Sequence, residues 1–551
     1  MKCPKCGNLV DLQKVISNEN CPHCGFYHYI QHALRVAAIA SRQVDYNEDF
    51  YFKNIHQRIY NSYISLNEGR VEPIDGALNL RGYLLEQFKT LIKPYPREDL
   101  YFIMLAMREL ATWKILLESE DTWASVQVRN VSHLFTNILS TMKEDDFGID
   151  GIVDETDFIS LFVYTEEIEK ISANILGTKI FSWKPTLEEI IKIRIENERH
   201  NEYYQHFEVQ ELVKPEEIEI NDEKINEFLT QRGIEINRVK KSVSKEIERL
   251  AGFSFKELKE FRSDIITIAK ESGQVFDIFP LNENKSIQAV FIFDDQLKDV
   301  ITKERENIIS YLTYGPSSEK EYLLNYITDP YMDFKFIFKY EGLLAFGILD
   351  SSNSISMLSN ITSSDHFIDK LFGFQATKVF KKAQQDIAYL IAMKIAEHFY
   401  KKDRDRYFVP LQQKGVPNVN IKQIIGNGIK KRLMSNKNQN LGDIDAVVVD
   451  LVKRKIFLME IKFFKPAVNQ REMLLKDKKI YEDINKILAR AEWFEKNISD
   501  VKKAWGLEHS NYEVETILIT GRPNYYGKKI EKEFRKVKYL TFDGLFRKGS
   551  L

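Results

Sequence analysis

The spacing of hydrophobic and polar positions changes along this chain, and the changes divide it into regions. From about residue 30 to residue 252 the apolar positions recur at helical spacing. Residues 100–116 are apolar on nearly every side, which predicts a long, largely buried helix. Further helices are predicted over 33–40 and from Leu187 onwards. The first half of the chain is therefore predicted to be a large helical region.

Residues 253–370 mix helical and strand-like patterns. Ser254 precedes a helical pattern and is a candidate N-cap. Residues 350–354, Asp-Ser-Ser-Asn-Ser, are typical of a loop. Short runs of aromatic and aliphatic residues with strand character occur at 289–293, 334–338 and 342–348. We expect a mixed α/β region without a recognisable chemical motif, which connects the helical region to the rest.

The last region, residues 371–551, reads as helix, strand, strand, helix, strand. This order is typical of an α/β core, in which helices pack on the faces of a sheet. The predicted elements are a helix over 378–401, paired strands over 447–449 and 456–461, a helix over 480–494, and strands over 514–520 and 539–542.

The two paired strands carry acidic side chains at their ends. The first begins with Asp443-Ile444-Asp445, and the second ends with Glu460-Ile461-Lys462. Because side chains alternate between faces of a strand, Asp443 and Asp445 share one face, and so do Glu460 and Lys462. Carboxylate oxygens are the ligands that Mg²⁺ prefers, and a nearby lysine suits a phosphate or an attacking water. The pattern favours a metal site over the alternative, an edge ribbon with merely solvated charges.

At these residues the chain resembles the PD-(D/E)xK, or restriction-endonuclease-like, nuclease superfamily. Gly-Asp-Ile-Asp-Ala-Val followed by Met-Glu-Ile-Lys is similar to the pattern of several restriction and repair nucleases, and the resemblance covers about the last third of the chain. It implies that Asp445, Glu460 and the Ile461 carbonyl hold Mg²⁺ or Mn²⁺, and that Lys462 is the catalytic lysine. Asp443 stands at a position that varies in the family.

Many members of this superfamily carry one more acid on the first helix, and this chain has no clear match for it. Asp386 is the first candidate and Glu397 the second, both within the predicted helix 378–401. The alternative, that both are surface charges, stays open.

Charge is distributed unevenly between the two parts of the chain. The whole chain carries 79 Lys+Arg and 81 Asp+Glu, but residues 371–551 hold 37 and 21 of them, a balance of +16. The first 370 residues therefore hold 42 and 60, a balance of −18. A basic domain beside an acidic remainder indicates a nucleic-acid partner, which we expect to be DNA. The candidate nucleic-acid-binding residues are Lys430, Lys431, Arg432 and Lys465.

All four cysteines of the chain lie within its first 24 residues. They are spaced as Cys3-x₂-Cys6, fourteen residues, then Cys21-x₂-Cys24. Four thiolates at this spacing form two knuckles around a tetrahedral Zn²⁺, which is favoured over disulfides or idle thiols. Since four protein ligands leave no open position, we expect this Zn²⁺ to be structural, in a fold that resembles a zinc ribbon.

Together these patterns predict a multidomain α + α/β protein. The expected parts are a zinc ribbon over 1–29, a helical interaction or sensor domain over 30–252, a mixed connecting domain over 253–370 and a restriction-endonuclease-like α/β core over 371–551. No apolar run reaches 18 residues and no signal peptide is recognisable, so we expect a cytoplasmic protein without a membrane partner.

The expected function is that of an Mg²⁺-dependent nuclease that cleaves DNA. By analogy with multidomain defence nucleases, its layout fits restriction or antiphage defence, with a protein partner or a second copy bound through the helical domain. The alternative function is a non-catalytic nucleic-acid-binding or scaffold protein that keeps a nuclease-like fold.

Overall fold

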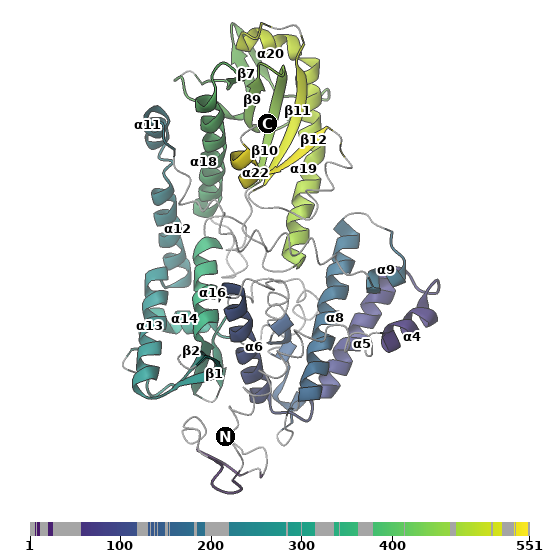
Figure 1. The fold of residues 1–551 in the computed structure, drawn as a ribbon, viewed down its shortest axis with the longest axis vertical. Coiled ribbons are helices and arrows are strands. Elements are labelled where there is room, and N and C mark those ends of the chain that lie inside the picture. The colour runs from purple at the N-terminus through teal and green to yellow at the C-terminus, as the bar shows by residue number, and fades with distance from the viewer. Residues whose placement is uncertain are drawn as a thin grey trace. The chain divides into compact units, whose positions relative to one another are not determined.

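The computed structural model forms two compact units, each described here by itself (Figure 1). The first comprises residues 1–204, 247–359 and 468–472, and the second comprises 205–246, 360–467 and 473–551. Apart from single-residue gaps, the structure describes residues 6, 8–11, 20–25, 57–117, 131–139, 142–148, 153, 155–180, 184–192, 220–282, 285–314, 335–361, 378–462, 470–508, 511–520 and 534–548.

The helices in the first part of unit 1 pack around a core of aliphatic and aromatic side chains. The predicted helix over 100–116 is confirmed as α6, and the helix from Leu187 as α9. Thr186 and Glu189 cap each other's backbone amides at the start of α9, at 3.1 and 2.8 Å. The predicted helix over 33–40 lies outside the described residues. The helices are α4 (Gln57–Asn67), α5 (Pro73–Ile92), α6 (Arg97–Leu117), α8 (Glu155–Ile180) and α9 (Leu187–Lys192), with a short turn η2 (Glu144–Asp146).

A small antiparallel sheet follows in the same unit, in the order β1-β2-β4-β3. The Ser254 side chain caps α13 by accepting the Glu257 amide at 3.1 Å, as predicted. The predicted strands correspond to β2 and β4, while β3 begins later than predicted, at Phe338. The elements are α13 (Phe255–Glu271), β1 (Val275–Asn282), β2 (Lys285–Phe293), α14 (Lys303–Leu312), β3 (Phe338–Tyr340), β4 (Leu343–Gly347) and α16 (Ile348–Ile361).

The loop predicted over 350–354 is wrong, because these residues form the first turns of α16. The reason lies on a distant helix. Both carboxylate oxygens of Glu109, on α6, accept amides at the start of α16, from Leu349 at 2.6 Å and Asp350 at 2.8 Å. A carboxylate at a helix N-terminus satisfies amides that have no partner within the helix. Local sequence favours a turn here, and this tertiary cap overrides it.

Unit 2 is built on a mixed sheet in the order β12-β11-β10-β9, with β5 and β6 on the outer side of β9. β9 and β10 are antiparallel, whereas β10, β11 and β12 are parallel. Three helices have residues in both units: α12 (Ile236–Ala251), α16 and α19 (Gln470–Lys496). The other elements of unit 2 are α11 (Glu223–Gln231), α18 (Lys378–Lys402), β5 (Tyr407–Phe408), β6 (Val419–Ile421), β7 (Gln423–Gly426), β8 (Ile429–Arg432), β9 (Ile444–Asp450), β10 (Lys455–Lys462), α20 (Ile498–Trp505), β11 (Glu513–Thr520), β12 (Val537–Thr541) and α22 (Phe542–Lys548).

The order of helix, strand, strand, helix and strand predicted for this region is confirmed by α18, β9, β10, α19 and β11. The central residues of β9 and β10 are buried. Val and Leu side chains on one face of these strands belong to the same hydrophobic cluster as residues of α19 and α20. The β7–β8 hairpin was not anticipated. The protein as described is thus predominantly helical, with a mixed sheet in its C-terminal part. None of the described helices combines the length and the apolar character needed to cross a membrane.

Candidate functional site

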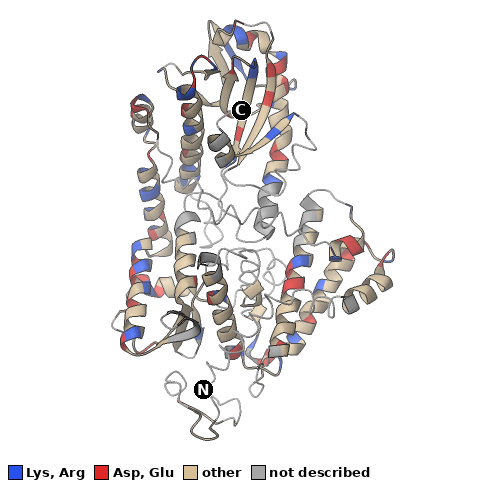
Figure 2. Ribbon diagram, in the orientation of Figure 1, with Lys and Arg blue, Asp and Glu red and all other residues tan. Residues whose placement is uncertain are grey.

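The ends of β9 and β10 bring the predicted acidic residues together. Their antiparallel pairing extends to Met459 opposite Ala446, so the next residues on the two strands, Glu460 and Asp445, are neighbours. Apolar residues fill the strands behind them, which confines the charges to one end of the hairpin. Figure 2 shows acidic and basic positions interspersed along the ribbon of this unit.

Asp445 is held by a backbone amide and repelled by an acid. Its Oδ2 accepts a hydrogen bond from the Ile461 amide at 2.7 Å. Burial, reinforced by the charge of Glu460, raises the Asp445 pKa to about 7, although the amide and Lys462 oppose the shift. Two carboxylates forced together in this way are a site where added positive charge is stabilising.

Lys462 lies between two acids from different elements. Its Nζ is 2.8 Å from Glu460 Oε1 on β10 and 2.8 Å from Asp483 Oδ2 on α19. Burial disfavours the lysine's charge, but the charge of Glu460 and the contacts with Asp483 outweigh it, so the Lys462 pKa is raised. Asp483 is half-buried, which opposes its charge, yet its bond to Lys462 lowers its pKa. Lys462 is therefore a fixed cation.

Arg490, also on α19, engages the other oxygen of Glu460. Its Nη1 donates to Glu460 Oε2, and its Nε donates to the Leu441 carbonyl at 2.8 Å. Arg490 and Glu460 are each only 8% exposed, so this pair is largely removed from water. A Cβ on Gly442 would lie 3.0 Å from Arg490 Nη2, in a backbone conformation with φ of +80° that favours glycine. Gly442 thus allows the guanidinium to approach the loop before β9.

The three less certain acids occupy different surroundings. Asp443 is partly exposed and adds to the charge that raises the Asp445 pKa. Asp386 accepts from Lys382 at 3.0 Å, one turn earlier on α18. Glu397 is buried, and its partners are the Asn221 amide at 2.9 Å, Lys401 at 3.2 Å and Lys394 at 3.5 Å. These contacts give Glu397 a structural role, so neither helix acid enters the proposal below.

The predicted nucleic-acid-binding residues separate into two kinds. Lys430 and Arg432 are exposed on β8, while Lys431 between them pairs with Asp500 of α20 at 3.0 Å. Lys465 lies outside the described residues.

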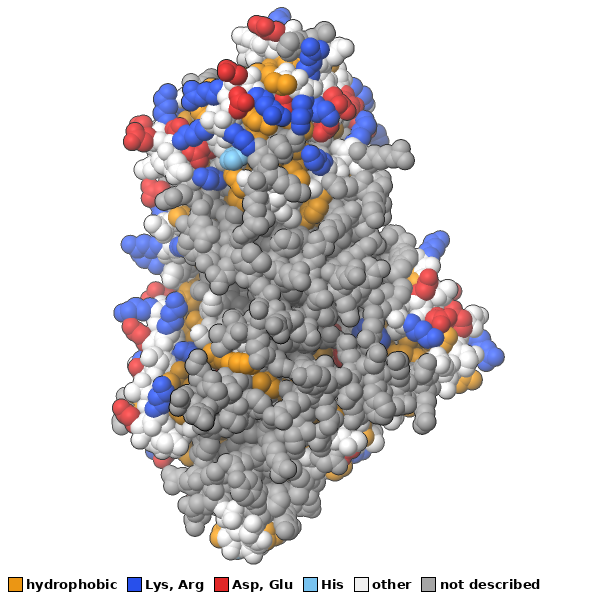
Figure 3. Space-filling view, in the orientation of Figure 1, with side chains coloured by type: hydrophobic (Ala, Val, Ile, Leu, Met, Phe, Trp, Pro, Cys, Tyr) orange, Lys and Arg blue, Asp and Glu red, His pale blue; other side chains and the backbone are white. Residues whose placement is uncertain are grey.

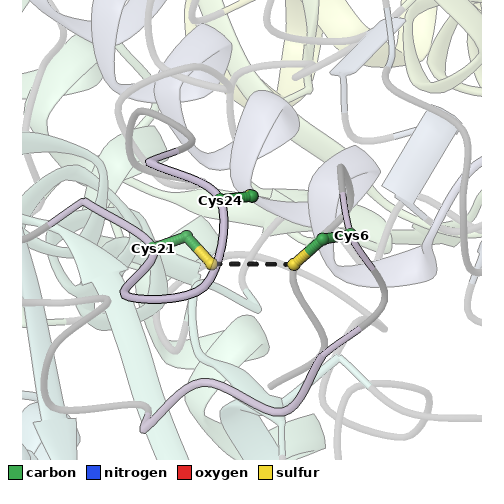
Figure 4. A group of neighbouring side chains, drawn as sticks. All are labelled: Cys6, Cys21 and Cys24. Atoms are coloured by element: carbon green, nitrogen blue, oxygen red, sulfur yellow. Dashed lines mark hydrogen bonds between the residues drawn. The ribbon is translucent and has the colours of Figure 1, made fainter.

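Three of the four predicted zinc ligands lie together in unit 1 (Figure 4). The Sγ atoms of Cys6, Cys21 and Cys24 are within 4.8 Å of one another, and Cys3 lies outside the described residues. Sγ of Cys6 and Sγ of Cys21 are 3.8 Å apart, too far for a disulfide. Tetrahedral thiolates about 2.3 Å from one ion stand about 3.8 Å from each other. This group could hold a metal ion.

The cysteine cluster is also joined to the rest of unit 1. Val10 and Cys21 are buried in the same hydrophobic cluster as α6, and Cys6 and Cys24 pack against that cluster. The Gly25 amide donates to the Cys21 carbonyl at 2.8 Å and closes the second knuckle. The cluster therefore covers one side of this core.

Asp483 and Arg490 were not found by sequence reasoning. Both lie on α19, 7 residues or about two turns apart, and Arg490 occupies a position in line with the buried Ile487, Ala491 and Phe494. A charged residue within an apolar stripe is the signal that could have indicated it.

The residues at the β9–β10 end suit a divalent cation by their chemistry. Asp445 and Glu460 offer carboxylate oxygens, and burial together with the charge of Glu460 raises the Asp445 pKa. Among the described residues, the three cysteines are the one group of three or more metal-ligating side chains close enough to share an ion. Asp445 and Glu460 are therefore two candidate ligands without a third acidic side chain beside them in the described part of the chain. No family model, curated protein or solved structure matches the chain.

Proposed function

We propose that unit 2 is a metal-dependent nuclease, which hydrolyses phosphodiester bonds, with DNA as its substrate. The observation that carries this proposal is the crowding of Asp445 against Glu460 beside the fixed cation Lys462. Metal-assisted hydrolases of phosphate esters use paired carboxylates to bind the metal ion and a nearby cation to stabilise negative charge. The resemblance to the PD-(D/E)xK superfamily and the mixed order of the sheet support a restriction-endonuclease-like core.

In this proposal Asp445 and Glu460 hold Mg²⁺ or Mn²⁺, together with the Ile461 carbonyl. The ion would supply a more acidic bound water and neutralise charge on the leaving oxygen. The Ile461 amide orients Asp445 toward the site. Lys462 would orient or deprotonate the attacking water and stabilise negative charge on the phosphorane.

The cysteine cluster is proposed to hold structural Zn²⁺, with Cys3 as the fourth ligand. The Cys6–Cys21 spacing supports this assignment, since it equals the spacing of tetrahedral thiolates around Zn²⁺.

The experiment that tests the nuclease compares cleavage by native protein, Glu460→Ala and Lys462→Ala. Supercoiled plasmid, linear duplex, single-stranded DNA and RNA are incubated with Mg²⁺, Mn²⁺ or EDTA. We expect native cleavage of DNA, abolished by EDTA and reduced at least about 100-fold in both variants, as for loss of a main electrostatic contact. Lys478→Ala is the matched control, since Lys478 is exposed on α19 and pairs only weakly with Glu482. Equal activity in Lys462→Ala would contradict the proposal.

One observation favours the alternative, a non-catalytic scaffold. Both oxygens of Glu460 are engaged, by Lys462 and by Arg490, so the ion pairs already stabilise this end of the sheet. Calorimetry separates the two functions. A nuclease binds Mn²⁺ in a way that Glu460→Ala removes, whereas a scaffold shows nucleic-acid binding that Mn²⁺ and Glu460→Ala leave unchanged.

A further inference from the structure

We propose that the outward face of the β7–β8 hairpin is the surface on which this protein holds the phosphate backbone of nucleic acid. This inference rests on the proposed function only in taking nucleic acid as the partner. It adds which surface of unit 2 binds that partner. The outward face is defined by Gln423, Ile425, Lys430 and Arg432.

The pairing of the hairpin determines which side chains share this face. Ile425 is opposite Lys430 and Gln423 is opposite Arg432, whereas Ile424 is opposite Lys431. Because paired residues point to the same side and neighbours alternate, Lys431 points away from Lys430 and Arg432. The turn is Asn427-Gly428 with φ of +43° and +77°, which is the tight turn that suits a two-residue hairpin.

The inward face is anchored on α20. Ile424 is 1% exposed, and Lys431 pairs with Asp500 at 3.0 Å. Asn427 Nδ2 donates to the Lys503 carbonyl at 2.8 Å. At Gly426 a Cβ would come within 2.1 Å of the Ala504 carbonyl, so the strand lies directly on the helix. The hairpin is therefore held in place, and binding through its outer face would need little ordering.

The outward face is basic, and the stretch of sequence that forms it carries no acids. Lys430 and Arg432 are exposed, as is Lys422 just before β7. Residues 406–442 contain seven Lys or Arg and no Asp or Glu. In the space-filling view, many Lys and Arg side chains lie over the end of unit 2 that carries β7 and α20, with Asp and Glu side chains among them (Figures 1 and 3). Such a surface is complementary to a polyanion.

The geometry also suits a regular polyanion. Lys430 and Arg432 are two residues apart on one strand, about 6.8 Å, so each can contact a separate phosphate. Ile425, opposite Lys430 on the neighbouring strand, is 48% exposed and offers an apolar contact for sugar or base. An acidic protein would present carboxylates without this regular spacing, and we therefore favour nucleic acid.

Backbone hydrogen bonds connect this hairpin to the candidate active site. The Leu433 amide, directly after β8, donates to the Lys422 carbonyl at 3.1 Å, and the Leu441 amide donates to the Leu433 carbonyl at 3.1 Å. The Leu441 carbonyl in turn accepts from Arg490, the partner of Glu460. A strand of nucleic acid on the outward face is thus received by a part of the chain rigidly joined to the acidic pair.

The test measures binding without cleavage, in full-length Glu460→Ala protein without added Mg²⁺ or Mn²⁺, so that the proposed structural Zn²⁺ is left in place. Fluorescence anisotropy follows labelled duplex DNA, single-stranded DNA, RNA and polyglutamate over a range of salt concentrations. Lys430→Gln/Arg432→Gln removes two outward charges, and Lys431→Gln removes the inward, paired one. We expect the double variant to bind nucleic acid at least about 10-fold more weakly and to reduce the salt slope by roughly 1.8, or 0.9 for each phosphate contact. Lys431→Gln should remain within about twofold of its parent.

Three outcomes would overturn the inference. One is equal weakening by Lys431→Gln, which would indicate net charge rather than a defined face. Another is binding that the double variant leaves unchanged, with a native thermal midpoint for both variants. The third is polyglutamate bound as tightly as nucleic acid through the same two residues, which would indicate an acidic protein partner. If the native protein binds nucleic acid through this face but does not cleave it, the proposed binding surface is supported and the proposed nuclease activity is rejected.

Discussion

Arg490 donates to Glu460 across thirty residues of chain, from the middle of a helix to the end of a strand. The same guanidinium also holds the Leu441 carbonyl, in the loop that leads into β9. One side chain of α19 therefore connects the two segments that carry the proposed metal ligands. The geometry of the candidate metal site therefore depends on Arg490, which lies outside the Asp445…Glu460-Ile461-Lys462 motif.

We expect Arg490→Ala to destabilise unit 2. Removing one partner of a buried ion pair leaves the other charge uncompensated, which costs roughly 3 kcal/mol. Hydrogen exchange of the Glu460 and Ile461 amides would report the loosening, and chemical denaturation its free energy. Glu492→Ala, an exposed change on the same helix, should leave both measurements unchanged. Native protection in Arg490→Ala would show that the contact is dispensable.

Asp483→Asn should slow cleavage without abolishing it. Asp483, on α19, pairs with Lys462 in addition to Glu460, so its loss loosens the lysine without removing it. We expect kcat to fall about 10-fold while KM changes little, because substrate binding elsewhere is intact. Steady-state kinetics beside Glu482→Gln, the exposed neighbouring acid, provide the comparison. A change confined to KM would instead assign Asp483 to substrate binding.

Glu109 should make the stability of unit 1 fall as the pH rises. Burial raises the Glu109 pKa from 4.5 to about 8, against the opposing effect of the two amides that it accepts. Below pH 4.5 the side chain is protonated in both folded and unfolded chains. Between pH 4.5 and pH 8 the unfolded chain loses the proton first, so ionisation favours unfolding. Stability is lost across this window, on the order of 5 kcal/mol at about 1.4 kcal/mol per pKa unit, and levels off above it.

Denaturation of native protein and Glu109→Gln at several pH values checks this expectation. The variant cannot ionise, so its stability should decline less between pH 5 and pH 8. An equal decline in the free energy of unfolding of the two proteins would contradict the raised pKa of Glu109.

The cysteine cluster should contain one Zn²⁺ per chain, and its loss should weaken unit 1. Cys21→Ser removes a ligand that is also buried against the helical core. Because metal binding to such a site adds directly to folding free energy, we expect the thermal midpoint to fall on the order of 5 °C. Elemental analysis gives the metal content, and calorimetry the midpoint. A chelator should lower the midpoint of native protein and leave that of Cys21→Ser unchanged.

The cluster of two carboxylates and a lysine at the β9–β10 end and the helices could be predicted because their signals are local. Asp445, Glu460 and Lys462 lie within eighteen residues on two adjacent strands, and alternation alone places them on shared faces. Similarly, the apolar run of α6 and the cap at Ser254 depend on neighbours in sequence. Their assignment as catalytic residues stays a prediction.

What could not be predicted depends on contacts between distant segments. Residues 350–354 form a helix because Glu109 caps it, more than two hundred residues earlier. Lys430, Lys431 and Arg432 look equivalent in sequence, yet the pairing of β7 with β8 turns only Lys431 toward Asp500. Asp483 and Arg490 belong to a long helix rich in charges, where only packing against the sheet distinguishes them from solvated residues.

The placement of Arg490 also affects the order of events during synthesis. The β9–β10 hairpin can form from local contacts, but Asp445 and Glu460 then repel each other with only Lys462 to compensate them. A nascent chain acquires Asp483 and Arg490 later, and α19 must dock before the acidic end of the sheet is neutralised. We therefore expect a chain truncated before residue 490 to carry the whole motif without the arginine that engages the second oxygen of Glu460.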